Sequence, residues 1–240
     1  MGSGGDCHSC SIAESTMSLV TERTARHQNE SLPECSPDPW ISSLLIVQKT
    51  DLRQDLLNQR RSLPSEAWQD ASLRLCQQVQ ATALFQQAKT ILAYVSVRRE
   101  PDITALWALP KVWGLPRCEG EALVWHRWSL ADPLVAGRYG LQEPAAELPT
   151  LTVEEVDLML VPCVACDRQG YRLGYGGGYY DRLLADPAWA AKPTIGLVFE
   201  FAYLPALPSD PWDIPLTWIC TEQRSYPGQG THGADRSIEA

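Results

Sequence analysis

Two hydrophobic patterns follow one another along the chain. Apolar side chains recur at helical spacing over residues 49–61, and again from Trp68 to Val79 after a break at Pro64. Short, continuous apolar runs come next, and such runs are typical of strands that are buried on both faces. We expect strands at residues 90–95, 112–116, 122–128, 156–162, 194–199 and 216–220, with helices near residues 102–109 and 179–184.

The alternation of buried strands with helices indicates a largely parallel sheet, because crossover connections between parallel strands cover the faces of the sheet. We therefore expect an α/β fold, a single-domain three-layer sandwich with a mostly parallel, Rossmann-like sheet and helices on both faces. This domain should span residues 47–223. Residues 1–46 and 224–240 are rich in polar residues, Gly and Pro, which predicts a disordered N-terminal extension and a disordered C-terminal tail.

Composition and charge narrow the class of partner. The 240 residues are 45% hydrophobic and 20% charged, which suits one sizeable core. The formal net charge of -9 and the lack of a basic run argue against a nucleic-acid partner, although local arginines would still permit a small anionic ligand. No stretch approaches the roughly 20 apolar residues of a membrane span, and the N-terminus has no hydrophobic signal core. We therefore expect a cytoplasmic protein, and a monomer, although the sequence does not itself reveal the oligomeric state.

The eight cysteines include two close pairs, Cys7 with Cys10 and Cys163 with Cys166. A zinc site would join these four thiolates across the chain. We favour packing instead, because the second pair lies in a strand-to-loop run where cysteine behaves as a small buried hydrophobic residue. Disulfides are not expected in a reducing cytosol. Of the four histidines only His126 falls in the expected core, so a Ser-His-Asp triad or a histidine-bound metal has little support.

The segment Asp167–Arg182 has the composition of a phosphate-binding loop. Four glycines lie between Arg172 and Asp181, and glycines let the backbone approach an anion and turn its N–H groups inward. Arg172 and Arg182 can add positive charge, while Asp181 can hold the divalent cation that accompanies a polyphosphate. A buried-strand pattern at residues 156–162 precedes the loop and a helix start follows it, so the anion would lie at a helix N-terminus.

Two better-known glycine loops are excluded by spacing. A P-loop ends in Gly-Lys followed by Ser or Thr, and no such pair follows these glycines. A dinucleotide fingerprint would need a third glycine at the position of Tyr179. A glycine-rich surface turn is the alternative interpretation, and the flanking Arg, Tyr and Asp residues argue against it. Lys49 and Arg53 lie one helical turn apart, so their side chains either point at one polyphosphate or belong to a solvated helix face.

With its flanking residues, the loop resembles the signature of the 5-formyltetrahydrofolate cyclo-ligase family, also called methenyltetrahydrofolate synthetases. That signature has a strand ending in Pro, a short stretch ending in Asp, and then Gly-x-Arg-Leu-Gly-x-Gly-Lys-Gly-Tyr-Tyr-Asp-Arg. The matching residues are Pro162, Asp167, Gly170, Arg172, Leu173, Gly174, Gly176, Gly178, Tyr179, Tyr180, Asp181 and Arg182. Further matches occur in the family's order at Lys49-x-x-Leu52-Arg53, Glu100-Pro101-Asp102, Gly140-Leu141-Gln142-Glu143-Pro144 and Trp212-Asp213. The resemblance covers about residues 47–222, a span typical of one domain.

The resemblance implies an enzyme that converts 5-formyltetrahydrofolate to 5,10-methenyltetrahydrofolate, with ATP as co-substrate and Mg²⁺ as cofactor, and releases ADP and phosphate. The γ-phosphoryl group would be transferred to the formyl oxygen, after which nitrogen-10 would close the ring. By position, the ATP-binding residues would be Lys49, Arg53, Arg172, Leu173, Gly174, Tyr175, Gly176, Gly177, Gly178, Tyr179 and Tyr180. Asp181 and Asp213 would bind magnesium, and Val95, Glu100 and Tyr179 would bind the folate. The catalytic residues would be Glu100 and Tyr179 together with Arg172.

Other interpretations of these residues stay open. Asp181 could cap the helix that it begins, and Glu100 and Asp213 could be turn residues beside prolines. The chain could also be a binding module that retains the nucleotide loop without turnover, or an ATP-dependent kinase or ligase that acts on another small amide. The presence of both Glu100 and Asp213 favours the enzyme. The clearest departure from the signature is Gly177, which stands where many family members carry Lys, so other groups would have to meet the phosphate charge.

Overall fold

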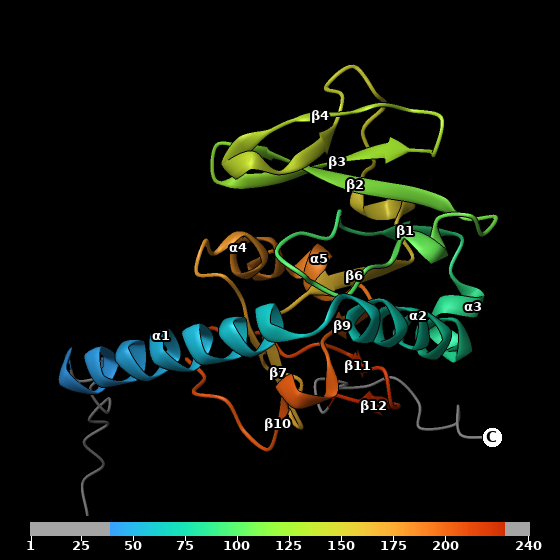
Figure 1. Cartoon of the computed structure of the whole chain (residues 1–240). Coiled ribbons are helices and arrows are strands. Elements are labelled where there is room, and N and C mark those ends of the chain that lie inside the picture. The colour runs from blue at the N-terminus through green and yellow to red at the C-terminus, as the bar shows by residue number, and fades with distance from the viewer. Residues whose placement is uncertain (1–38, 229–240) are drawn as a thin grey trace, which may run out of the picture. The chain divides into compact units, whose positions relative to one another are not determined.

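The structure is a computed structural model, and its central element is a seven-stranded sheet (Figure 1). The described residues are 39–228, with side chains from residue 49 onward. The chain divides into two units, Met1–Pro37 and Asp38–Ala240, and the first lies outside the described residues. Within residues 39–228, no helix has both the length and the apolar character needed to cross a bilayer.

The sheet is mostly parallel, with the strand order β12-β11-β9-β6-β1-β2-β3. The five inner strands pair in parallel, whereas β3 and β12 run antiparallel at the two edges. The strands are β1 (Thr90–Leu92), β2 (Val112–Glu119), β3 (Ala122–Trp128), β6 (Leu158–Pro162), β9 (Thr194–Leu197), β11 (Trp218–Cys220) and β12 (Ser225–Pro227). The α/β class and the mostly parallel sheet predicted from the apolar runs are thus confirmed.

Helices cover both faces of this sheet, which makes three layers. Along β6, Met159 and Val161 pack in a core cluster with side chains from α1 and α4, whereas Leu158 and Leu160 pack in a second cluster with side chains from α2 and α3. Successive side chains of a strand point to opposite faces, so the two clusters are the two sides of the sheet. The helices are α1 (Pro39–Ser62), α2 (Ser65–Ala81), α3 (Ala83–Gln87), α4 (Tyr179–Ala185) and α5 (Pro187–Ala190).

Two small sheets were not predicted from the sequence. One pairs β4 with β5, and the other has the order β10-β7-β8. Strands of two or three residues give no recognisable periodicity, and their pairing is decided by the tertiary fold. The bounds are β4 (Leu134–Ala136), β5 (Gln142–Pro144), β7 (Ala165–Asp167), β8 (Arg172–Leu173) and β10 (Tyr203–Leu204). Short 3₁₀ helices, η1 (Thr104–Leu106), η2 (Arg138–Gly140), η3 (Val153–Glu155) and η4 (Glu200–Ala202), complete the elements.

Three expectations differ from the structure. The helix expected near residues 102–109 is only the single turn η1. The first helix begins at Pro39 rather than near Lys49, so part of the extension expected to be disordered is helical. The tail expected from residue 224 includes β12, because its backbone pairs with β11 and the Gly228 N–H donates to the Thr217 carbonyl at 2.9 Å. The expectations for residues 1–38 and 229–240 lie outside the described residues.

A buried carboxylate holds the turn at residues 167–171, which leads into the glycine-rich segment. Asp167 is almost completely buried at the end of β7, and its Oδ1 accepts hydrogen bonds from the N–H groups of Gln169 and Tyr171 at 3.0 and 2.9 Å. Its Oδ2 accepts from the Leu207 N–H at 2.9 Å. Gly170 has a φ of +96°, and a Cβ there would lie 2.6 Å from the Leu216 carbonyl oxygen. The family signature's Asp and first Gly are therefore structural at these positions.

We predict that Asp167→Asn destabilises the protein by about 1–3 kcal/mol, because an amide can replace only one of the two accepting oxygens and leaves a buried N–H group unpaired. Chemical denaturation measures this loss. Asp186→Asn is the matched control, since Asp186 accepts a single hydrogen bond, from the Ala188 N–H, at an exposed helix start. Equal stabilities of the two variants would contradict the assignment.

Candidate functional site

One cavity of about 520 Å³ brings together all the site residues predicted from the sequence. They come from α1, from the segment after β1, from the stretch that runs from β8 through the glycines into the first turn of α4, and from the segment before β11. The residues are Lys49, Arg53, Val95, Glu100, Arg172, Leu173, Gly174, Tyr175, Gly176, Gly177, Gly178, Tyr179, Tyr180, Asp181 and Asp213. Their roles stay predictions, but their assembly around one cavity is a property of the fold.

Two positions of the glycine loop, residues 174–178, have a backbone conformation that requires glycine. Gly176 and Gly178 have φ values of +91° and +69°, a conformation that side chains with a Cβ disfavour. Gly178 is the residue before α4, so the loop leads directly into that helix. Gly177, in contrast, is not in the left-handed region. A Cβ at residue 177 would lie 3.2 Å from the Tyr179 ring, which is tight but requires only a small shift.

The Arg172 side chain is more deeply buried than that of Lys49, with 5% exposed against 17%. One terminal nitrogen donates to the Ile214 carbonyl at 2.8 Å, and the other forms an ion pair with Asp181. The Asp181 side chain is 50% exposed. Arg53, on α1, donates from Nε to the Gly174 carbonyl at 2.7 Å, and burial lowers the pKa of its guanidinium. Helix α1 is therefore tied to the glycine loop.

Lys49 is held by two carboxylates. Its Nζ lies 2.6 Å from Asp210 Oδ2 and 3.1 Å from Asp213 Oδ2. Burial alone would lower the pKa of the ammonium, but the hydrogen bonds and charges of these two carboxylates outweigh it and raise the pKa above its usual value. The Asp213 carboxylate also accepts from the Asp210 backbone N–H at 2.8 Å. Asp210 was missed from the sequence, where only its closeness to Asp213 hinted at a shared site.

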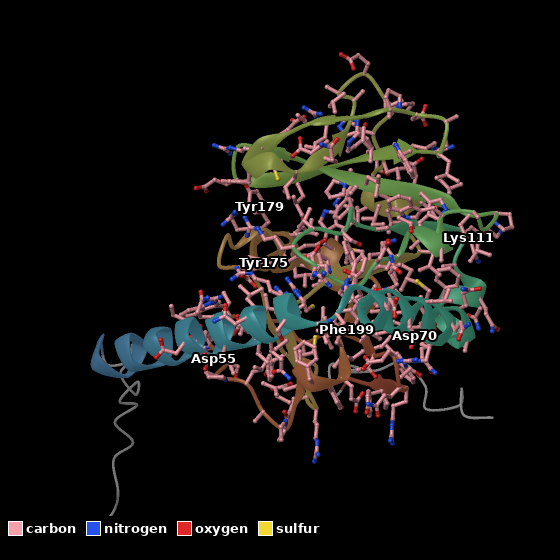
Figure 2. All side chains as sticks on the ribbon, viewed as in Figure 1. Asp55, Asp70, Lys111, Tyr175, Tyr179 and Phe199 are labelled. Atoms are coloured by element: carbon pink, nitrogen blue, oxygen red, sulfur yellow. The ribbon has the colours of Figure 1, made fainter. Side chains whose placement is uncertain are left out.

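Two tyrosines meet beside the turn between β2 and β3. The Tyr179 hydroxyl lies 3.4 Å from that of Tyr139 and 3.3 Å from the Gly120 carbonyl, and the two rings approach edge to face. The hydrogen bond to Tyr139 contributes most to raising the pKa of Tyr179 to about 12, so its hydroxyl is protonated at neutral pH. Figure 2 shows Tyr179 on the side of the β2–β3 hairpin and Tyr175 below it, toward α1. Tyr139 lines the cavity and was missed, although it directly precedes the matched segment that begins at Gly140.

Glu100 supplies a buried carboxylate to the cavity. The residue is 2% exposed, and its Oε2 accepts from the Val97 N–H at 3.0 Å. Burial raises the pKa of this carboxyl group above its usual value, against the opposing effects of the Val97 N–H, a hydrogen bond with Tyr175 and the charges of Arg60 and Arg98. Arg98 also lines the cavity and has a φ of +49°, a strained conformation for a residue with a side chain.

The residues around the cavity suit a divalent cation that arrives with a ligand rather than a resident metal. Among residues 49–228, no group of three or more His, Cys, Asp or Glu side chains could hold a metal ion. Asp181 and Asp213 both line the cavity, and Mg²⁺ commonly binds one or two protein carboxylates together with substrate phosphates and water. Of the four thiolates weighed for zinc, Cys163 and Cys166 are buried and free, while the other two lie outside the described residues.

Fold and cavity together define an α/β protein with a cavity near the carboxyl ends of parallel strands, the usual place of a ligand site in such folds. Cations, carboxylates and a glycine loop form part of the cavity wall. The model of the 5-formyltetrahydrofolate cyclo-ligase family matches residues 46–222. The chain therefore belongs to this family of folate enzymes, ligases of one-carbon metabolism.

Individual relatives agree with the family match. The 5-formyltetrahydrofolate cyclo-ligase of Mycolicibacterium smegmatis is 34% identical, in an alignment that covers 73% of this chain and 94% of that protein. The enzyme of the same name from Escherichia coli strain K12 is 28% identical over 70% of this chain and 96% of its own length. Among solved structures, the 5,10-methenyltetrahydrofolate synthetase of Aquifex aeolicus has a TM-score of 0.68 and 32% identity, and covers 80% of this chain and 96% of that one.

Proposed function

We propose that this protein converts 5-formyltetrahydrofolate to 5,10-methenyltetrahydrofolate with consumption of ATP and release of ADP and phosphate. The observation that carries the proposal is the composition of one cavity wall, which combines three cations, Lys49, Arg53 and Arg172, with the buried Glu100 carboxylate. Cations and a glycine loop suit a polyphosphate, while a carboxylate among aromatic and apolar side chains suits a pterin.

The reaction has to overcome two chemical obstacles. The carbon of a formyl amide is a poor electrophile, and hydroxide is a poor leaving group. In the proposed sequence the formyl oxygen attacks the γ-phosphorus of ATP, and the bond to ADP breaks. Nitrogen-10 then attacks the activated carbon and loses its proton, which forms the second C–N bond. The C–O bond to phosphate then breaks, and the carbon stays joined to both nitrogens in the methenyl cation. The nucleophiles belong to the substrates, so the protein mainly aligns them and excludes water.

The cations of α1 and β8 would bind the phosphates. Lys49 and Arg53 come from one helix face, and Arg172 lies on β8, just before the glycine loop. The N–H groups of the glycine loop would add neutral donors, which can approach phosphate oxygens closely because no Cβ intervenes. Asp181 and Asp213 would hold Mg²⁺, which when bound neutralises part of the phosphate charge.

Glu100 and Tyr179 would orient the folate. A carboxylate accepts hydrogen bonds from the amino and ring N–H groups that a pterin carries. The Tyr179 hydroxyl is protonated at neutral pH, so it can donate to a substrate oxygen or nitrogen. Val95 follows β1 along the chain and lines the cavity with Tyr94, which gives an apolar side to the pterin pocket.

Two of the proposed phosphate-binding cations are paired with the two proposed magnesium ligands. Arg172 pairs with Asp181, and Lys49 pairs with Asp213 as well as with Asp210. Binding of the magnesium nucleotide would therefore exchange protein ion pairs for pairs with the ligand. Such an exchange keeps the charges compensated in both states, and it makes the metal and the nucleotide bind better together than either alone.

Turnover tests the proposal directly. Purified protein incubated with 5-formyltetrahydrofolate and magnesium-ATP should develop the near-ultraviolet absorption of the methenyl product, and omission of either ATP or Mg²⁺ should abolish it. A binding module would bind both ligands without this absorption change. A kinase or ligase for another amide would fail to bind 5-formyltetrahydrofolate. Either of these results would overturn the proposal.

The Asp181→Asn variant should lose turnover by orders of magnitude with little change in melting temperature, because the amide keeps the side chain's size and its hydrogen bond to Arg172 but lacks the charge that a divalent cation requires. Steady-state kinetics at saturating magnesium and a thermal melt measure the two effects. Turnover close to that of the wild type would remove Asp181 from the metal site.

Asp210→Asn should tighten nucleotide binding by about two- to fivefold, because it removes a competing charge from Lys49 and leaves the backbone N–H bond to Asp213 in place. Calorimetry with magnesium and a non-hydrolysable ATP analogue measures this without turnover. Asp213→Asn is the matched comparison, and it should weaken binding because it removes a proposed metal ligand. Weaker binding by both variants would contradict the exchange of ion pairs.

Arg172→Gln should raise the KM for ATP strongly and lower the rate, a loss on the order of 2 kcal/mol or more for a desolvated charged hydrogen bond. Gly177→Lys should restore part of this loss, because residue 177 is not in the left-handed region and a lysine there can reach the phosphates. Gly177→Ala is the control that adds the Cβ without the ammonium. ATP kinetics decide the matter, since equal effects of Lys and Ala at residue 177 would mean that the added charge does not reach the phosphates.

A further inference from the structure

Arg60 is a buried cation next to the cavity that none of the preceding roles involves. It lies near the C-terminal end of α1, and the residue is 3% exposed. None of the ion pairs formed among residues 49–228 includes it. Its Nε is buried and has no hydrogen-bond partner within the same residues. A buried guanidinium without a directly paired carboxylate costs folding free energy, so its retention calls for a reason.

The contacts of Arg60 converge on Tyr175 in the glycine loop. One terminal nitrogen donates a hydrogen bond to the Tyr175 hydroxyl, and the guanidinium carbon lies 5.4 Å from the centre of the tyrosine ring. The other terminal nitrogen reaches the Cys163 carbonyl at 3.5 Å. A hydrogen bond combined with a cation–π contact fixes both the ring and the hydroxyl of Tyr175.

Tyr175 also interacts with Glu100. Tyr175 and Glu100 both line the cavity, and a side-chain hydrogen bond between them is among the effects that lower the pKa of the Glu100 carboxyl group. Because the tyrosine oxygen accepts from Arg60, its single O–H is available to donate to that carboxylate. Arg98, from the segment after β1, adds a second cation 5.5 Å from the Tyr175 ring centre. Three segments that form the cavity wall, α1, the glycine loop and the segment after β1, therefore meet at one tyrosine.

We propose that Arg60 is a positioning residue: through the Tyr175 hydroxyl it holds the Glu100 carboxylate and the glycine loop in a fixed relation to each other. The inference rests on the proposed function, in which the glycine loop binds the nucleotide and Glu100 binds the folate. Arg60 would then orient both ligands without touching either of them, since it does not line the cavity. The Tyr175 side chain would be shared between the two halves of the site.

Several charged or titratable groups surround Glu100. Burial raises the pKa of its carboxyl group, and the charges of Arg60 from α1 and Arg98 from its own segment oppose this. Tyr94 in the segment after β1, Tyr175 in the glycine loop and Tyr180 on α4 face it as neutral groups, whose own pKa values burial raises above the usual value. Loss of the Arg60 charge therefore leaves burial less opposed, and the carboxylate takes up a proton at a higher pH.

The test compares Arg60→Gln with Arg61→Gln, which removes the neighbouring, exposed guanidinium of the same helix. In Arg60→Gln the acid limb of kcat/KM for 5-formyltetrahydrofolate should move to higher pH by about one unit. The KM for the folate should rise about tenfold or more, the effect expected for loss of a hydrogen-bonded charge. Arg60→Lys keeps the charge and should recover most of the acid limb. Arg61→Gln should match the wild type in both readouts.

An unchanged acid limb and folate KM in Arg60→Gln would overturn the proposal, and a uniform loss of activity at all pH values would assign Arg60 a structural role only. If Arg60→Gln does not fold, Arg60→Lys and Tyr175→Phe carry the test as a double-mutant cycle on the folate KM. Both substitutions remove the hydrogen bond between the Arg60 guanidinium and the Tyr175 hydroxyl, although Arg60→Lys keeps the charge. The double variant should therefore be no worse than Tyr175→Phe alone, and additive losses would overturn the proposal. Failure of the proposed function itself is distinguishable, because the wild type would then show no turnover.

Discussion

The parallel pairing of β1 with β6 brings the two central parts of the cavity wall to one edge of the sheet. Ile91 pairs with Leu158 and Leu92 with Met159, so the two strands end at the same edge of the sheet. The loops that leave them carry Glu100 and the glycine loop, which meet because parallel strands direct their carboxyl ends to one side. A slip by one residue would exchange the two faces of β6, and both core clusters oppose that because each holds alternate β6 side chains.

The charges of the cavity show how a chain with a net charge of -9 can present a site for an anion. Lys49 and Asp213 are 164 positions apart in the sequence and form an ion pair. With Arg172 and Asp181, they form two ion pairs in which cations and carboxylates of the cavity wall compensate one another. Local geometry therefore sets the field in the cavity, so the acidic remainder of the chain is compatible with the proposed binding of phosphate.

The sequence predicted the long apolar strands well, because a strand such as β6 is continuously apolar. The residues that it indicated for a site line one cavity, and the specific motif of the glycine loop made them recognisable, while their roles stay predictions. It could not predict Asp210, whose contact with Lys49 depends on the tertiary fold. Tyr139 was out of reach for a different reason, since only the β4–β5 hairpin brings it to Tyr179, and strands of three residues leave no pattern. Arg60 looked like one more polar residue of a helix, and only its burial distinguishes it from Arg61.

Gly177 stands where the family signature has lysine, and the backbone of the loop explains which of its positions could carry a side chain. Gly176 and Gly178 need their left-handed backbone, so the loop cannot carry a side chain at either position without strain. Residue 177 is the one of these three where a lysine would fit, and this chain has glycine there. Arg53 compensates from outside the loop: its Nε bonds to the Gly174 carbonyl, and its guanidinium carbon lies 3.9 Å from the place of a Cβ at residue 176. The positive charge beside the glycines thus comes from α1 through Arg53 and from α4 through Arg182, which donates to the Gly177 carbonyl at 2.9 Å. The strength of the proposed phosphate site would therefore depend on how firmly both helices pack against the loop.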